Sequence, residues 1–145
     1  MPADSWKLAA GLNSVGSYQV SGRPWASGSC VAAPSGSAYC IRFPAVTKWV
    51  QIEPVNSNGD HLRVAFSENG LFGKGSPSTD GGYNFQVHAS SSLRGPLDLK
   101  VGELWFMSET SDAITFDLVV GLTGIPVERC KGDEGRSWSG SAGVG

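Results

Sequence analysis

Apolar and polar residues alternate along much of the middle of this chain, in short segments. Between residues 61 and 67, Leu62, Val64 and Phe66 point one way in an extended chain and the residues between them point the other way. A period of two is typical of a β-strand with one buried face. Five more segments follow this rule, and their inward sets are Tyr39, Ile41 and Phe43; Val46, Val50 and Ile52; Tyr83, Phe85 and Val87; Leu97, Leu99 and Val101; and Ile114, Phe116, Leu118 and Val120. The pattern predicts an all-β fold.

Clusters of Gly, Ser and Pro separate these segments, as in SGRPWASGSC, APSGSAYC and GKGSPSTDGG. Gly adopts positive φ without steric cost and Pro cannot donate to a strand ladder, so such clusters indicate turns. The pair Asn58-Gly59 is typical of a two-residue hairpin turn, which predicts that residues 46–67 form an antiparallel hairpin. Residues 100–108 form either one strand with a bulge at Gly102 or two strands that meet at a bend there.

The number of predicted strands, about eight, favours an antiparallel β-sandwich. A jelly roll is the preferred topology, and an immunoglobulin-like arrangement is the second choice. The sandwich is expected to span residues 17–130. Residues 1–16 and the Gly/Ser-rich residues 131–145 lack the apolar content to fold alone. We therefore expect an N-terminal arm and a flexible C-terminal tail that become ordered on a partner surface.

Composition narrows the classes of partner. The chain has 145 residues, enough for one domain with its own core, and 11 basic against 13 acidic residues give a net charge of −2. No run of Lys and Arg provides the positive patch that nucleic acid or an anionic membrane requires. No window approaches the roughly 18 apolar residues of a membrane span, and the N-terminus does not have the pattern of a secretion signal. We expect a soluble protein made in the cytoplasm.

The two histidines, His61 and His88, both fall on outward positions of their strands. A catalytic histidine needs a nucleophile and an orienting partner, and the sequence signals neither beside these two. No nucleophile elbow supports a Ser/His/Asp triad. The prediction is that both histidines face solvent, and that the protein is not an enzyme and uses no cofactor.

The cysteines do not have the paired short spacings of a zinc site. Cys30 and Cys40 flank a turn-rich segment, so a disulfide across that segment is one possibility. The favoured alternative is that Cys30, Cys40 and Cys130 are all free thiols, because proteins made in the cytoplasm usually keep their cysteines reduced. Residues 56–60 begin like a calcium loop, but Ser67 stands where a bidentate Glu would complete the shell. We predict no metal site.

The chain is rich in tryptophan, with Trp6, Trp25, Trp49, Trp105 and Trp138. Alternation places Trp49 and Trp105 away from the predicted core. An outward Trp on a strand is buried under the same chain, anchors a protein interface, or stacks on a sugar ring. The candidate partner-binding residues are Trp25, Trp49, Trp105 and Trp138.

The succession LRVAFSENG, a Gly/Ser loop, YNFQV, LDLKVGELWFMS and ITFDLVVGLTGIP, within residues 46–127, resembles the small β-sandwich virion proteins of tailed phages and other double-stranded DNA viruses. These are the capsid decoration, cement and minor capsid proteins. The resemblance implies a protein of the capsid surface, assembled in the host cytoplasm. It further implies a homo-oligomer, with a trimer favoured, that binds the major capsid protein and strengthens the shell by bridging capsomers.

The sequence therefore predicts a non-enzymatic structural protein of the virion. The alternative is a carbohydrate-binding module or lectin-like receptor-binding domain, in which Trp25, Trp49 or Trp105 stacks on a sugar. A small hydrolase on a sandwich is the least favoured class, because no acid/base pair is clustered in the sequence.

Overall fold

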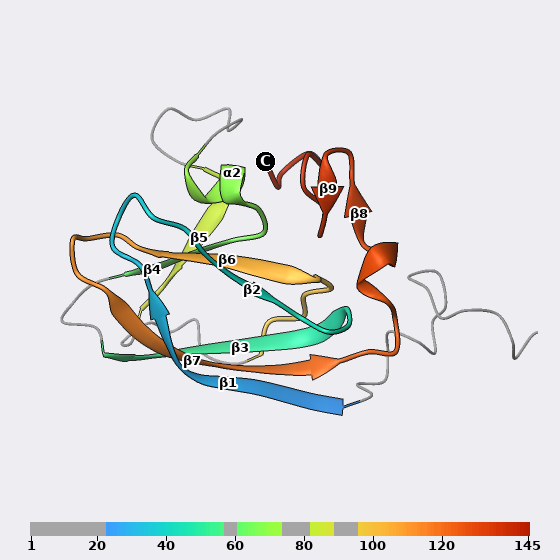
Figure 1. The fold of residues 1–145 in the computed structure, drawn as a ribbon, viewed down its shortest axis with the longest axis horizontal. Helices are drawn as coiled ribbons and strands as arrows, with labels where there is room; N and C mark the ends of the chain where they lie inside the picture. Colours follow the sequence, from blue (N-terminus) through green and yellow to red (C-terminus); the bar gives the residue numbers. More distant parts are fainter. Residues whose placement is uncertain (1–22, 57–60, 74–81, 89–95) are drawn as a thin grey trace, which may run out of the picture.

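The computed structural model describes residues 23–56, 61–73, 82–88 and 96–145. Two antiparallel sheets pack face to face (Figure 1). One has the order β1-β7-β3, with β1 Arg23–Ala32, β3 Thr47–Asn56 and β7 Ile114–Leu122. The other has the order β2-β6-β4-β5, with β2 Tyr39–Arg42, β4 Leu62–Ala65, β5 Asn84–Val87 and β6 Glu103–Ser108. A short helix α2, Glu68–Leu71, a 3-10 turn η2, Val127–Arg129, and the small hairpin of β8, Lys131–Gly132, and β9, Gly135–Arg136, complete the described elements.

The predicted antiparallel β architecture is confirmed, but the predicted hairpin over residues 46–67 is wrong. β3 pairs with β7, whereas β4 lies in the other sheet between β5 and β6. An alternating pattern records which face of a strand is buried and not which strand lies beside it. The Asn58-Gly59 turn itself lies outside the described residues, as do the predicted arm 1–16 and Trp6. Among the described residues, no helix is long and apolar enough to cross a bilayer.

Gly102 is the point at which residues 96–108 change sheets. Leu97 forms an antiparallel bridge with Val50 at the edge of β3 that does not face β7. The N–H of each residue donates to the carbonyl of the other. After Gly102 the chain enters β6, in the centre of the four-stranded sheet. Of the two alternatives for this segment, the structure therefore has two extended pieces that meet at a bend.

The core lies between the two sheets. Phe106 of β6 packs against Phe116 of β7 with ring centroids 4.5 Å apart. The inward positions that are fully buried around them come from both sheets, and include Val50, Leu62, Val64, Leu104, Ile114, Leu118 and Val120. Burial of one such side chain contributes about 1.5–3 kcal/mol. The period-two pattern thus selected the interior correctly on the central strands. Tyr39, at the start of β2, remains exposed despite its inward position.

A second apolar cluster lies on the outer face of the four-stranded sheet. Ala65, Leu71 and Met107 are buried there, and Ala38 and Trp105 pack against them. Helix α2 brings Leu71 to this face, and its first turn is capped by Ser67, whose Oγ accepts a 2.9 Å hydrogen bond from the Gly70 N–H. This cover explains why Ala65, an outward position of β4, is buried.

Residues 131–145 pack against the body of the protein, where composition had suggested a flexible tail. Trp138 contacts the main core, and its indole Nε1 donates a 2.8 Å hydrogen bond to the Lys100 carbonyl. The buried Ser137 Oγ accepts the Gly102 N–H at 3.0 Å, and near the chain end the Ser67 Oγ donates to the Val144 carbonyl. The chain therefore ends beside α2 (Figure 1). One aromatic anchor and a few backbone hydrogen bonds hold this Gly/Ser-rich segment, and a compositional argument does not detect them.

The Ser137→Ala variant tests this docking. It removes the acceptor of the Gly102 and Glu103 N–H groups, so we expect the free energy of unfolding to fall by about 1–3 kcal/mol. Ser139→Ala, two residues away, is the matched control, and we expect a change of less than about 0.5 kcal/mol. Urea unfolding measures both. Equal values for the two variants would contradict the buried role of Ser137.

Candidate functional site

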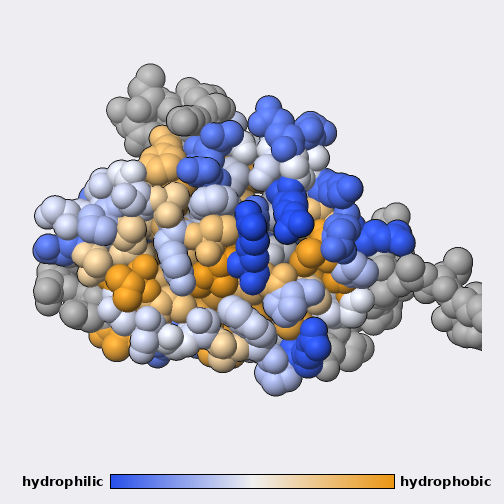
Figure 2. Space-filling view, viewed as in Figure 1, coloured by the Kyte–Doolittle hydropathy of each residue, from blue (hydrophilic) through white to orange (hydrophobic). Residues whose placement is uncertain are grey.

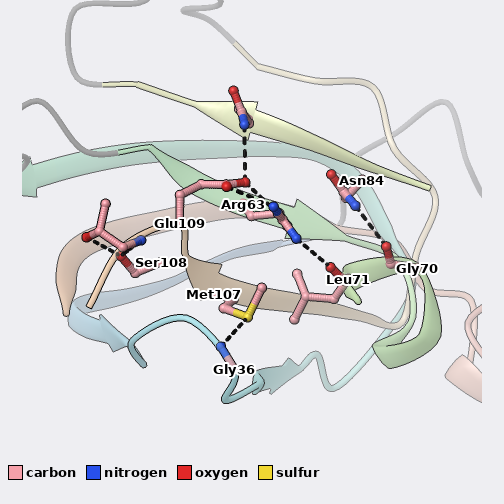
Figure 3. A network of polar contacts seen from close by, with 10 residues as sticks. Gly36, Arg63, Gly70, Leu71, Asn84, Met107, Ser108 and Glu109 are labelled. Carbon is pink, nitrogen blue, oxygen red and sulfur yellow. Dashed lines mark hydrogen bonds and ion pairs between the residues drawn. The ribbon is translucent and has the colours of Figure 1, made fainter. Parts of the chain in front are cut away.

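A network of polar contacts lies on the outer face of β4, β5 and β6, where Arg63 extends between Glu109 and the Leu71 carbonyl (Figure 3). The Arg63 Nη2 donates to Glu109 Oε2 at 2.8 Å and its Nε donates to Oε1, which makes the pair bidentate. Gln86 Nε2 adds a 3.1 Å hydrogen bond to Glu109 Oε1 from the neighbouring strand. Each donor and acceptor comes from a different element, so the site exists only when the sheet is assembled.

The electrostatics of Glu109 follow from these contacts. Hydrogen bonding from Arg63 is the main cause that lowers the pKa of the Glu109 carboxyl, with burial acting in the opposite direction. The carboxylate therefore stays ionised at neutral pH and acts as an acceptor. It is poorly suited to donate a proton as a general acid.

The two histidines meet beside this network. Leu62 and Val87 are cross-strand partners with buried side chains, so the adjacent His61 and His88 face outward on opposite strands. Their ring centroids are 4.5 Å apart, and the Glu109 N–H donates to the His61 carbonyl at 3.1 Å. The sequence alone predicts two separate solvent-facing histidines. A signal for this contact is present in the sequence, because His61 comes directly before the inward Leu62 and His88 directly after the inward Val87. An antiparallel pairing of Leu62 with Val87 therefore brings the two histidines together.

The four candidate tryptophans lie on different elements. Trp25 packs on the core and against Phe43 in a T-shaped contact with centroids 5.4 Å apart. Trp138 is the anchor of the C-terminal segment. Trp105 faces outward as predicted but packs in the cluster with Ala65, and its buried Nε1 has no hydrogen-bond partner among the described residues. A partner-binding role for any of these remains a prediction.

Trp49 differs from the others because it lies on the outer face of the three-stranded sheet. The next residue, Val50, and its cross-strand partner Val120 are both buried between the sheets. Trp49 therefore points away from the core. The residue across from it on β7 is Gly121, which is itself buried, and Trp49 is half-buried. Gln51 follows on the same face and donates a 2.9 Å hydrogen bond to Glu53.

Each strand of the three-stranded sheet carries an exposed valine: Val31 on β1 is 52% exposed, Val55 on β3 is 62% exposed and Val119 on β7 is 40% exposed. Glu53 and Asp117 are cross-strand partners on this sheet, so two acidic side chains face each other. The Ser29 N–H, in the irregular part of β1, donates to the Asp117 carboxylate at 2.8 Å. On the side that Figure 2 shows, apolar side chains appear in separate places among polar ones.

All three cysteines are free thiols. This is the alternative that the sequence favoured over a disulfide between Cys30 and Cys40. Cys30 lies in β1, whereas Cys40 lies in β2 of the other sheet with its thiol directed to Glu103. Burial is the main cause that raises the pKa of Cys40 and of Cys130 to about 11. At neutral pH these two thiols are protonated, which makes them poor nucleophiles.

No protein-family model, curated protein or solved structure matches this chain.

A double-mutant cycle with Arg63→Met and Glu109→Gln measures the strength of the polar site. The side chains are only 26% and 20% exposed and the pair is bidentate, so we expect a coupling energy of about 0.5–1 kcal/mol at pH 7. Because the folded-state pKa of Glu109 is lowered, this stabilisation is fully present above the ordinary value of 4.5 and is lost as the pH falls through the lowered value. Urea unfolding at pH 7 and pH 3 measures it. An equal coupling energy at both pH values would contradict the assignment.

Proposed function

We propose that this is a non-enzymatic structural protein that decorates a viral capsid as a homo-oligomer, with a trimer favoured, and bridges neighbouring capsomers through the major capsid protein. The observation that carries the proposal is the asymmetry of the two outer faces. Among the described residues, the chain covers much of the outer face of its own four-stranded sheet, whereas the other sheet exposes one valine on each strand. Tyr39 of β2 and Phe72 at the end of α2 are the other large apolar residues that are exposed. Exposed apolar side chains on a regular sheet are suited to contact another macromolecule.

The order of the strands supports a jelly roll as the finer description of the fold. Strands β1 to β4 change sheets at every step, β6 is inserted between β2 and β4, and β7 is inserted between β1 and β3. The extended residues around Leu97 add a further piece beside β3. Two Greek keys wound into a double sheet produce this interleaving, which occurs in capsid and lectin domains. An immunoglobulin-like fold keeps its first two strands in one sheet, whereas β1 and β2 lie in different sheets here.

The chemistry of the open face indicates the kind of surface it would meet. Val119 lies at the centre of the sheet on β7, and the acidic Glu53 and Asp117 lie opposite each other beside it. Like charges directly across a strand pair are unfavourable, and a cationic group from a partner would relieve that repulsion. We infer a capsid surface that presents apolar and basic side chains.

The Val119→Glu variant tests this contact. It places a third carboxylate at the centre of the face, so we expect cosedimentation with the capsid shells of the encoding virus to weaken at least about 10-fold. Ser111→Glu adds the same charge to the exposed connection between β6 and β7 and is expected to bind as the unmodified protein does. Thermal unfolding verifies that both variants fold.

Equal binding by the two variants would show that the outer face of the three-stranded sheet is not the contact with the capsid. It would not contradict the decoration role. The role itself requires that the unmodified protein sediments with the shells. A monomer in light scattering that also fails to sediment with them would overturn the proposed function.

A carbohydrate-binding module is the second candidate, because Trp49 lies on the outer face next to the amide of Gln51. An indole with a neighbouring amide offers a stacking surface and hydrogen bonds for sugar hydroxyls. This candidate predicts that a glycan selected on an array quenches the tryptophan fluorescence, and that Trp49→Ala abolishes binding while Trp105→Phe preserves it. Absence of glycan binding on the array would remove this candidate.

A further inference from the structure

We propose that His61 and His88 form a binding site for one divalent transition-metal ion, with Cu²⁺ bound most tightly. The proposal is independent of the capsid role. It depends on the cross-strand pairing of the adjacent Leu62 and Val87, which brings together two imidazoles that are 27 positions apart in the sequence.

The backbone holds the two histidines in fixed positions. Each is adjacent to a buried residue of the same sheet, His61 to Leu62 and His88 to Val87, and these two buried residues are direct partners in the β4–β5 pair. On the other side of β4, the backbone hydrogen bond from Glu109 to the His61 carbonyl continues the sheet by one more position. A site on paired strands is better positioned for chelation than a site on loops.

The spacing of the rings suits a single ion. The imidazole centroids are 4.5 Å apart and the ring planes are inclined by 46°, so the rings approach each other more closely on one side than at their centres. Two metal–nitrogen bonds of about 2.0–2.1 Å at a bond angle of about 90–110° require nitrogens about 3 Å apart. The proposed site therefore requires side-chain rotation about χ1 and χ2 that places one nitrogen of each ring at about that separation.

The donor set selects the class of metal. Neutral imidazoles suit Cu²⁺, Ni²⁺ and Zn²⁺, and for a given site the affinity of divalent ions peaks at Cu²⁺. Among the described residues no group of three His, Cys, Asp or Glu side chains is placed to hold one ion, so water would supply the remaining ligands. Glu109 is nearby but its two carboxylate oxygens are bound to Arg63 and Gln86. Its charge also balances that of Arg63, which limits repulsion of a cation.

Electron paramagnetic resonance during titration of the full chain with Cu²⁺ tests the site. We expect one tightly bound ion per chain, with hyperfine splitting from two nitrogens. His61→Ala and His88→Ala each leave one imidazole, so each is expected to weaken binding about 10–100-fold and to remove one nitrogen from the splitting. Isothermal titration with Ni²⁺ repeats the measurement with an ion that does not oxidise thiols.

Glu109→Gln is the matched control, because it keeps the size of the side chain and removes the charge next to His61. The variant leaves the charge of Arg63 unbalanced, so we expect its affinity for Cu²⁺ to fall, but by less than about 3-fold, because charges that are partly exposed to solvent interact weakly. His61→Asn and His88→Asn retain a polar side chain and keep the test valid if an alanine variant fails to fold. Unchanged Cu²⁺ affinity in both histidine variants, or a spectrum with one nitrogen, would overturn the proposal.

Discussion

The contact between the two sheets is the interaction on which the rest of this structure depends. Phe106 and Phe116 meet across it, and the buried valines and leucines of every central strand surround them. Once one face of each strand is committed to this interior, the other face is fixed as outward. The pairing of His61 with His88 and the outer position of Trp49 are both consequences of that constraint.

Among the described residues, the two outer faces then differ because other parts of the chain cover them unequally. Helix α2, the cluster around Met107 and the docked residues 131–145 add a layer over the four-stranded sheet. The opposite sheet exposes a valine on each strand. The proposed capsid role uses the outer face of the three-stranded sheet, and its support is this difference together with the strand order.

Each polar site is assembled from residues that are distant in the sequence. Arg63 of β4 reaches Glu109 at the end of the neighbouring strand β6, and Trp138 reaches the Lys100 carbonyl from the C-terminal segment. Both arrangements are cooperative with folding, because neither pair is in contact in an extended chain. The metal site proposed at His61 and His88 belongs to the same class. It would report on the β4–β5 pairing directly, whatever the partner of the open face is.

The sequence by itself determined most of the strands and the orientation of most of their residues, because alternation depends only on the two-residue period of an extended chain. The predicted strand over residues 97–101 forms only an isolated bridge at Leu97. The sequence predicted Val50, Leu62 and Phe116 as interior residues, and it predicted His61 as outward. Only the tertiary structure decided the partners: β3 joins β7 rather than β4, Ala65 is buried beneath a second layer, and Trp138 holds a segment whose composition suggested flexibility. The physical reason is that burial of a face is a local property of a strand. Which strands pair, and which outer faces are covered by other segments, depend on contacts between residues far apart in the chain. The local pattern of a single sequence does not show these contacts.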